Sequence, residues 1–491
     1  MALKATGNAL LKVKRHAAAA AAYSEALSLA AGAGADVTLR SLLLSNRSHA
    51  RCCCGAFTKA AEDAEEAARA GLGEWGPAVA AARRGEELGG AGARAEFGAL
   101  LDRLALAAAA AGSHAGFDGR CLEVREAGPD AWLGREAPAD AELDCEEAGP
   151  LALAPAAPLE LASDAERASA AASQALIAAW RKRSFRSLRA AVEAARDGDT
   201  ILLQRGTHNG MGDAVVVTKR LLIRGAGSTG DARLDQRANS PALRLERASV
   251  VEGLDIDMTG FREAVHVAGG VAVAPLLQHC IIRCSGDDAF NACGHTAPVL
   301  RGCRLQAKRC GVRAYGDAAV SMTDCLLEDC GEQGAKGFDR AALTLCRCQV
   351  RRCGEEGVLV TDRARAHLEG CRISACLGPS LDASLQAALH AADCSFIGCM
   401  GALFLWDEAL AELSASELQA DAAYVVLAHG ASRPLLRKCA VEGRPFAQTR
   451  AAREGIWHPS NSLTEPRGKH IGTPVETGPF EFVPDPYTRK Q

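Results

Sequence analysis

The chain has 491 residues, of which 48% are hydrophobic but 4% aromatic. This length excludes a single small domain, and an apolar mass made of Ala, Leu, Val and Cys favours repeated layers over an aromatic core. The net charge of −4, without a long basic run, excludes nucleic acid as an expected partner. No uninterrupted apolar run reaches about eighteen residues, and the start of the chain lacks a signal-peptide core, so we expect no membrane association and a cytoplasmic protein.

Residues 1–106 have a helical pattern, with Ala and Leu recurring every three or four positions and Gly-containing breaks between the helices. The breaks predict six helices in three hairpins. Ala or Gly is needed where two paired helices approach closely, and Tyr23 and Phe57 would fill the gap beside the turn. The positions that define the repeat pattern are Gly7, Asn8, Ala20, Tyr23, Ala26, Leu27, Asn46, Arg47, Ala50, Gly55, Phe57, Ala60, Asp63, Ala64, Ala67, Arg83, Arg84, Gly85, Leu88 and Gly92. In these positions the segment resembles the tetratricopeptide repeat (TPR) family, which implies an α-helical repeat array.

A subgroup of that family grips the C-terminal carboxylates of heat-shock chaperones with Lys and Asn four residues apart, a further Asn, and Lys-x-x-x-Arg. Lys4 and Asn8 match the first element, Asn46 the second and Arg83 the last Arg, whereas Val79 stands at the family Lys. Charge-assisted hydrogen bonds to a carboxylate are strong, so the missing Lys predicts a weaker clamp with the same preference for acidic tails. The alternative is that these residues are solvated charges and packing polar groups.

Two other segments show no sustained period. Residues 107–165 are rich in Ala, Gly, Pro and acidic side chains, which is typical of a spacer that leaves the flanking domains variably placed. Residues 451–491 contain six prolines, which predicts a mostly disordered tail.

Residues 166–450 carry a second, longer repeat. A helical pattern over residues 165–182 is followed at 185–203 by a switch to a β-rich run, which continues at 215–227. Downstream, Cys residues recur at intervals of 22 or 23 in two series, Cys280, Cys303, Cys325, Cys348, Cys371 and Cys394, and Cys330, Cys353, Cys376 and Cys399. Each Cys and the aliphatic residue two positions later alternate with polar residues, as in strands with one buried face.

This ladder resembles the right-handed parallel β-helix, whose first coil follows a short capping helix. The resemblance implies roughly ten or eleven coils in which residues one repeat apart lie above one another. We therefore predict inward columns of thiols, with no zinc site and no cofactor, because Cys-x4-Cys along a strand does not converge tetrahedrally. Gly311, Gly331 and Gly354 are expected at turns with unusual dihedral angles. The fold class is multidomain α plus β, a TPR array followed by a β-helix.

An active site is considered because the fold resembles that of pectate lyases, polygalacturonases and alginate epimerases. Asp287 and Asp288 in SerGlyAspAsp, with His295 in GlyHis, superficially resemble a polygalacturonase segment, although the rest of that signature is absent. Adjacent strand residues point to opposite faces, so the two Asp residues form a pair only if a turn reorients them. These three residues are weak catalytic candidates, and the alternative is that the Asp residues serve a turn.

We predict from these patterns a non-enzymatic adaptor. The helical repeats would bind an acidic C-terminal peptide, such as that of a heat-shock chaperone, and the solenoid would present a second surface to another protein. One alternative is a carbohydrate-active enzyme of the polyuronate lyase or hydrolase type. A second, by analogy with cytosolic β-helix domains of F-box proteins, is a ubiquitin-ligase substrate adaptor, and a third is a purely structural protein.

Overall fold

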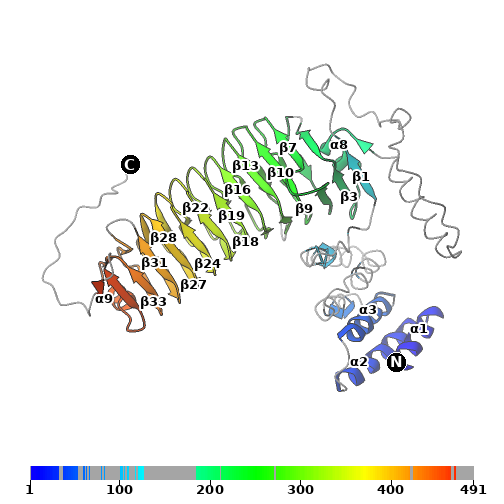
Figure 1. Ribbon diagram of the computed structural model, residues 1–491. Helices are drawn as coiled ribbons and strands as arrows, with labels where there is room; N and C mark the ends of the chain where they lie inside the picture. The colour runs from blue at the N-terminus through cyan, green and yellow to red at the C-terminus, as the bar shows by residue number, and fades with distance from the viewer. Residues whose placement is uncertain are drawn as a thin grey trace, which may run out of the picture.

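The structure is a computed structural model, and a long β-solenoid dominates it (Figure 1). It describes residues 2–32, 37–53, scattered positions between 59 and 120, and 121–125, 184–210, 212–269, 273–420, 424–465 and 469–470. The strands run parallel from coil to coil, apart from one antiparallel pair at the C-terminal end. The predicted parallel β-helix is confirmed.

Each coil gives one strand to each of three sheets, and sheet C counts eleven strands in the described part of the chain. Sheet A contains, in spatial order, β2 (Ser184–Phe185), β1 (Cys121–Val124), β3 (Thr200–Leu203), β6 (Leu222–Gly225), β9 (Val250–Glu252), β12 (Leu276–Gln278), β15 (Val299–Arg301), β18 (Ala319–Thr323), β21 (Ala342–Cys346), β24 (Arg365–Glu369), β27 (Ala388–Ala392), β30 (Leu410–Ser414) and β33 (Arg433–Arg437). Sheet B contains, from the C-terminal end, β37 (Lys469–His470), β36 (Ser462–Glu465), β34 (Ala440–Glu442), β31 (Glu417–Ala420), β28 (Ser395–Cys399), β25 (Arg372–Ser374), β22 (Gln349–Arg351), β19 (Leu326–Glu328), β16 (Arg304–Ala307), β13 (Ile281–Cys284), β10 (Leu254–Met258), β7 (Ala232–Gln236) and β4 (Gly206–Asn209). Sheet C contains β35 (Pro445–Ala447), β32 (Val426–Ala428), β29 (Gly401–Leu405), β26 (Pro379–Ala383), β23 (Val358–Val360), β20 (Ala335–Gly337), β17 (Val312–Ala314), β14 (Phe290–Ala292), β11 (Val265–Val267), β8 (Leu243–Leu245) and β5 (Val215–Val217).

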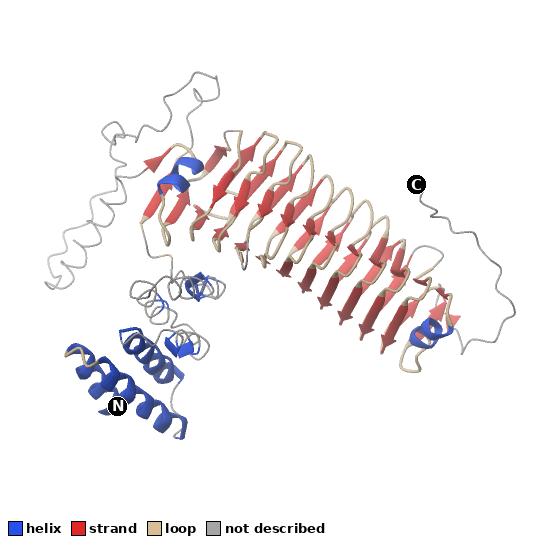
Figure 2. Ribbon diagram, turned by 180° about the vertical axis from the view of Figure 1, so that it is seen from behind, coloured by secondary structure: helices blue, strands red, loops and turns tan. Residues whose placement is uncertain are grey.

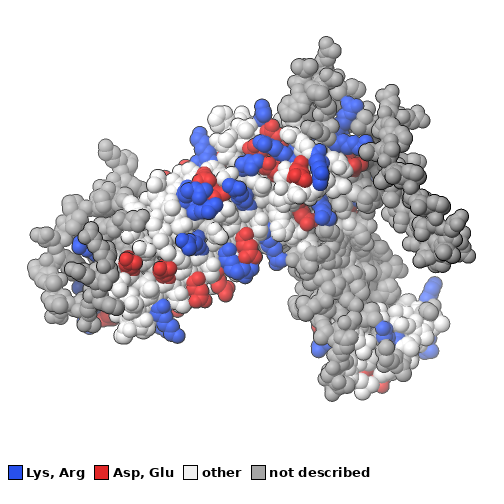
Figure 3. All heavy atoms as spheres, viewed as in Figure 1, with Lys and Arg blue, Asp and Glu red and all other residues white. Residues whose placement is uncertain are grey.

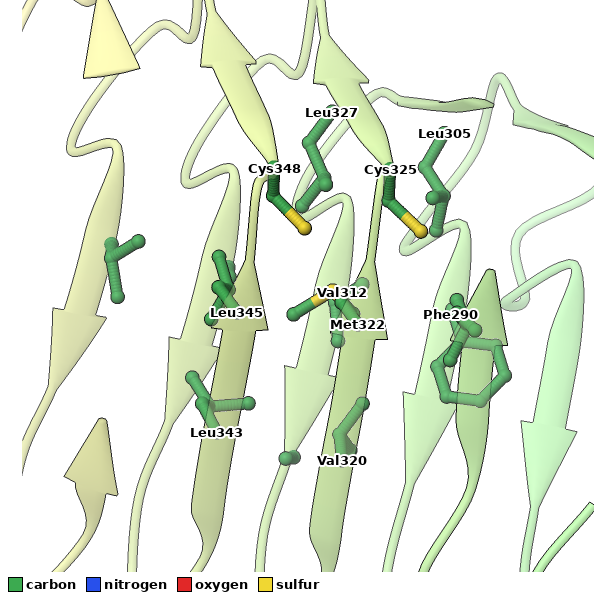
Figure 4. Packing of buried hydrophobic residues seen from close by; sticks show 14 of the residues in the cluster. Phe290, Leu305, Val312, Val320, Met322, Cys325, Leu327, Leu343, Leu345 and Cys348 are labelled. Atoms are coloured by element: carbon green, nitrogen blue, oxygen red, sulfur yellow. The ribbon is translucent and has the colours of Figure 1, made fainter. Parts of the chain in front are cut away.

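The interior of the solenoid is a continuous apolar core of stacked side chains (Figure 4). Leu305 pairs with Leu327 on the next coil, and Leu327 pairs with Val350, so like residues stack on like. Cys325 and Cys348 lie in the same kind of column and are 2% and 1% exposed. The predicted thiol columns are confirmed by this register.

The thiols are occupied with packing and backbone contacts. The backbone N–H of Cys371 donates to the Sγ of Cys394 at 3.4 Å, and that of Cys376 donates to the Sγ of Cys399 at 3.3 Å. Contact with the Cys303 thiol and burial raise the pKa of Cys325 to about 12. All sixteen described Cys residues are free, and they form no disulfide.

The turns differ from the prediction that glycine supplies unusual dihedral angles after the second Cys. Gly311, Gly331 and Gly354 do not have positive φ. A Cβ on Gly331 or Gly354 would lie 2.0 Å from the Lys308 carbonyl oxygen and 2.2 Å from the Gly331 carbonyl oxygen, respectively, so close packing of successive coils requires glycine. The left-handed conformation falls instead on the residue before most of the buried Cys residues and their Ser equivalent. These residues are His279, Gly302, Asp324, Arg347, Gly370, Asp393, Ala415, Lys438, Asp329, Arg352, Ala375 and Gly398.

A short helix covers each end of the apolar core (Figures 1 and 2). Helix α8 (Leu188–Ala194) begins after Ser187, whose side chain accepts the Ala190 N–H, and it buries its apolar face on the first coils. Helix α9 (Arg450–Ile456) buries Ile456 on the last coils. The tail expected to be disordered therefore begins with α9 and β36, because these residues cover the core end. The helix predicted over 165–182 lies outside the described residues.

Three helices open the chain, α1 (Ala2–Lys12), α2 (His16–Gly32) and α3 (Val37–Cys53). The buried Tyr23 of α2 packs against Gly7 of α1, where an added Cβ would lie 2.5 Å from the Tyr ring. A small residue at the helix contact and an aromatic residue beside it are thus observed as predicted. Most positions of the later predicted helices lie outside the described residues.

The helical part contacts the solenoid directly. Ala105, Ala109 and Phe117 pack on apolar residues of the outer face of sheet A, which are Leu222, Val250, Leu276 and Val299. Asp102 forms ion pairs with Arg220 at 3.1 Å and Arg247 at 3.0 Å. Strand β1, from the segment predicted as a spacer, pairs with β3. The spacer prediction missed these contacts because short Ala-rich and extended pieces carry no period of their own.

Basic and acidic side chains are interspersed on the outside of the solenoid (Figure 3). Several arginines pair with an aspartate one coil earlier, as Arg340 does with Asp317 at 2.6 Å and Arg347 with Asp324 at 2.8 Å. Solvent screens such exposed pairs, so they balance charge more than they stabilise the fold. None of the described helices has the length and apolarity needed to span a membrane.

Candidate functional site

The turn before β14 separates the two predicted aspartates. The Asp288 side chain is buried, and its Oδ1 accepts the Cys310 backbone N–H at 3.0 Å. The Asp287 side chain is turned to Arg309, whose Nη1 lies 3.3 Å away. Burial raises the pKa of Asp288, against the opposing effect of the Cys310 N–H. The structure therefore does not present these carboxyl groups as an exposed acid and base pair.

His295 lies beyond the other end of β14. Its side chain is 65% exposed, and its Nδ1 lies 3.5 Å from the Asp317 carboxylate. The three residues of β14 separate it from Asp288 along the strand. The three catalytic candidates therefore do not form one site.

Part of the predicted peptide clamp is placed by the structure. The Tyr23 hydroxyl donates to Asn8 Oδ1 at 2.7 Å, and Asn46 Nδ2 lies 3.4 Å from the same oxygen. Asn8 and Asn46 thus come together, but they contact each other and the helix core. Lys4 is half-buried on α1, and Val79 is buried, so the position of the missing Lys faces the protein interior. Arg83 lies outside the described residues.

A cluster of polar and aromatic side chains lies instead on the outer face of sheet C. We call it the sheet C cluster, and it consists of Glu263, His266, Asp288, Asn291, Cys293, Arg313, Tyr315 and Phe338. Strand pairing brings these residues together, because His266 on β11 pairs with Asn291 on β14, and Asn291 pairs with Arg313 on β17. The cluster spans four successive coils on rigid strands and their adjoining turns.

One side of the cluster is a line of three ionisable groups. Glu263 Oε1 lies 2.7 Å from His266 Nδ1, and Cys293 Sγ lies 3.8 Å from His266 Nε2. The Glu263 side chain is 3% exposed and that of His266 is 14% exposed. Burial acts to raise the pKa of Glu263, but the contacts with His266 and the backbone outweigh it and hold the pKa below its usual value. Glu263 is therefore a carboxylate at neutral pH.

The other side of the cluster combines a cation with stacked rings. The Arg313 guanidinium lies 5.2 Å from the centre of the Phe338 ring and 3.5 Å from Asp288 Oδ2. The Tyr315 and Phe338 rings stack with centres 5.2 Å apart and planes 8° from parallel. Burial and a contact with Cys293 raise the pKa of Tyr315 to about 12, so its phenol keeps its proton at neutral pH.

Metal binding has no support from this geometry. In the described part of the chain, no three His, Cys, Asp or Glu side chains converge as they would around an ion. The cluster contains an imidazole, a thiol, a phenol and a guanidinium, a set suited to proton transfer and anion binding.

The sequence analysis missed the cluster because its spacing is irregular. Glu263, Asp288 and Cys310 occupy equivalent places before three successive strands of sheet C, yet the intervals between them are 25 and 22 residues. The Cys series begins at Cys280 and so gives no register for the preceding coil. Aligning the coils on sheet C would have placed Glu-x-x-His, Asp-x-x-Asn-x-Cys and Cys-x-x-Arg-x-Tyr above one another.

The comparisons with known proteins concern the solenoid. The family model described as right handed beta helix region matches residues 263–418. A solved pectate lyase is 12% identical with a TM-score of 0.36, covering 56% of this chain and 75% of its own. The A-module of a mannuronan C-5 epimerase from Azotobacter vinelandii is 11% identical with a TM-score of 0.39, covering 58% of this chain and 95% of its own. The catalytic unit of an alpha-1,3-glucanase from Streptomyces thermodiastaticus is 11% identical with a TM-score of 0.37, covering 57% and 64%. No curated protein matches.

These comparisons correct the predicted function. The predicted adaptor function is contradicted, because the similar solved structures include a pectate lyase, an epimerase and a glucanase, which favour the alternative of a carbohydrate-active protein. The matched family model begins at residue 263, so it gives no support to a TPR array or to chaperone binding. At these identities the likeness describes the fold, and an activity of this chain has to be argued from its own residues.

Proposed function

We propose that the solenoid acts on an acidic polysaccharide bound across the sheet C cluster, by elimination at a uronate residue. The observation that carries this proposal is the combination of Arg313 with the stacked rings of Tyr315 and Phe338 on a rigid outer face. A guanidinium binds a carboxylate through charge-assisted hydrogen bonds, and an aromatic surface packs against the apolar side of a sugar ring. The Arg313 side chain is 29% exposed, so part of its guanidinium group can be reached from outside the solenoid.

Elimination is favoured over hydrolysis by the state of the carboxyl groups. Glycoside hydrolysis uses two carboxyl groups on either side of the scissile bond, both in reach of the substrate. The side chains of Asp288 and Glu263 are 1% and 3% exposed, and Asp287 is paired with Arg309. None of them is free to approach a glycosidic bond.

The imidazole and the phenol supply the proton transfers that elimination needs. In the proposed step, His266 removes the proton next to the uronate carboxylate while Arg313 neutralises that carboxylate. The electron pair forms the ring double bond, and the glycosidic C–O bond breaks. Tyr315, which keeps its proton at neutral pH, donates it to the departing oxygen.

The test is turnover of polygalacturonate and alginate, followed by the ultraviolet absorbance of unsaturated uronate ends. Arg313→Ala is expected to lower kcat/KM by about 100- to 1,000-fold, since it removes charge stabilisation at the reacting group. The matched control is Arg347→Ala, whose side chain is 59% exposed and paired with Asp324 in the turn that follows sheet A strand β21. The kcat/KM of this control variant should stay close to that of the wild type. Absence of unsaturated product from both polymers, with normal folding, would overturn the proposal.

A further inference from the structure

Cys293 differs from the other described thiols in its surroundings. Of the sixteen Cys side chains that the structure describes, thirteen are buried, and those of Cys121, Cys293 and Cys346 are partly exposed. Of these three, Cys346 has the Arg347 guanidinium 3.3 Å away, and burial with the nearby charges of Glu123 and Asp199 raises the pKa of Cys121. Cys293 instead has an imidazole nitrogen 3.8 Å from its sulfur.

The contacts of His266 determine which way a proton moves. Its Nδ1 lies 2.7 Å from the Glu263 carboxylate, a close contact without hydrogen-bond geometry, and we assign the ring hydrogen to this nitrogen because the negative charge beside it favours a donor there. The other nitrogen, Nε2, then has a free lone pair and faces Cys293 Sγ. A nucleophile, a base and a carboxylate that orients the base are thus arranged in line, as nucleophilic catalysis requires.

The backbone fixes this arrangement. The Cys293 N–H donates to the Val267 carbonyl at 3.0 Å, which continues the pairing of β11 with β14. His266 precedes Val267, so the imidazole and the thiol lie on neighbouring coils with a set offset. Glu263 lies in the turn just before β11, three residues from His266. None of the three groups depends on a long loop for its position.

We propose that Cys293, His266 and Glu263 form a nucleophilic thiol site that takes acyl esters, such as O-acyl groups on a saccharide held at the sheet C cluster. His266 accepts the thiol proton, and Sγ attacks the ester carbonyl carbon. The C–O bond to the alcohol breaks, and the alcohol leaves with the proton from His266. Water activated by His266 then cleaves the thioester and releases the carboxylic acid. The choice of a saccharide as the substrate rests on the proposed function, but the reactivity of the thiol toward esters does not.

The first test is alkylation of the native full chain with iodoacetamide, followed peptide by peptide with mass spectrometry. Cys293 should be alkylated at least about tenfold faster than the partly exposed Cys121, because His266 Nε2 lies 3.8 Å from Cys293 Sγ and is placed to accept its proton, whereas burial raises the pKa of Cys121. His266→Gln should remove most of that difference, and Glu263→Gln part of it. Equal rates at Cys293 and Cys121, or a Cys293 rate that His266→Gln does not change, would overturn the inference.

The second test uses p-nitrophenyl acetate as a probe ester. We expect a burst of p-nitrophenol and an acetyl group on the Cys293 peptide, both lost in Cys293→Ser and retained in Cys346→Ser. Thermal melts of each variant confirm that it folds. Acetylation of Cys293 without any polyuronate product would refute only the elimination, whereas polyuronate product with an inert Cys293 would refute only the thiol site.

Discussion

Replacing Phe290 by Ala is expected to lower the free energy of unfolding by about 3–5 kcal/mol, the usual effect of removing a buried aromatic ring. Phe290 has no exposed surface and pairs with Val265 on the coil before and Val312 on the coil after (Figure 4). Because each coil contacts its neighbours directly, a cavity here would loosen β11 and β17 as well as β14. Urea denaturation followed by circular dichroism measures the loss.

Phe261→Ala is the matched control, since the Phe261 side chain lies in a neighbouring turn and is 77% exposed. Its effect should stay within about 0.5 kcal/mol. Similar losses for the two variants would contradict the stacked core described for this part of the solenoid.

Glu328→Gln is expected to destabilise the protein by about 1.5–3 kcal/mol at neutral pH, the range for hydrogen bonds to charged groups. The Glu328 side chain has no exposed surface, and its carboxylate pairs with Arg304 at 2.5 Å and with Arg351 and Arg352 at 2.7 Å each. A neutral amide would leave the positive charges of three guanidinium groups without the negative charge that now balances them. Thermal melts of wild type and variant at neutral pH measure the difference.

The same carboxylate predicts a pH dependence. Burial acts to raise the pKa of Glu328, but the arginines outweigh it and the pKa lies below its ordinary value of 4.5. A lowered folded-state pKa contributes stability above the ordinary value, and that stability is lost as the pH falls through the lowered value. Wild type should therefore lose more stability than Glu328→Gln on acidification below about pH 4.5. Asp324→Asn, which breaks an exposed pair with Arg347, is the control and should change stability far less than Glu328→Gln does, because solvent screens that pair.

The solenoid could be predicted from the sequence because one residue type, the buried Cys, recurs once per coil and so reveals the register of the strands. A buried thiol one repeat above another requires equal coil lengths, so intervals of 22 or 23 between Cys residues specify parallel coils. The turn chemistry could not be read in the same way. Asp324, Arg347 and Ala375 all adopt positive φ before a buried residue, and such different side chains give no common signal.

The sheet C cluster could not be predicted because its residues belong to different coils of unequal length. His266 and Cys293 are 27 residues apart, whereas the visible period is 23. The adjacent pair of Asp287 and Asp288 drew attention because it is contiguous, yet a turn directs one side chain inward and the other to Arg309. The cluster is formed by residues that are neighbours in space on adjacent coils, and not by residues that are neighbours in the sequence.

Helices α8 and α9, which cover the two ends of the core, limit the end-to-end association of copies of the protein. The first and last coils of a parallel solenoid each have an unpaired strand edge, which is a template for another copy. Because α8 and α9 cover the apolar cross-sections, stacking of copies into an end-to-end fibre is blocked sterically. Truncation before residue 450 uncovers the C-terminal end alone, because α8 still covers the first coils, so we expect it to produce a dimer joined end to end and not a fibre.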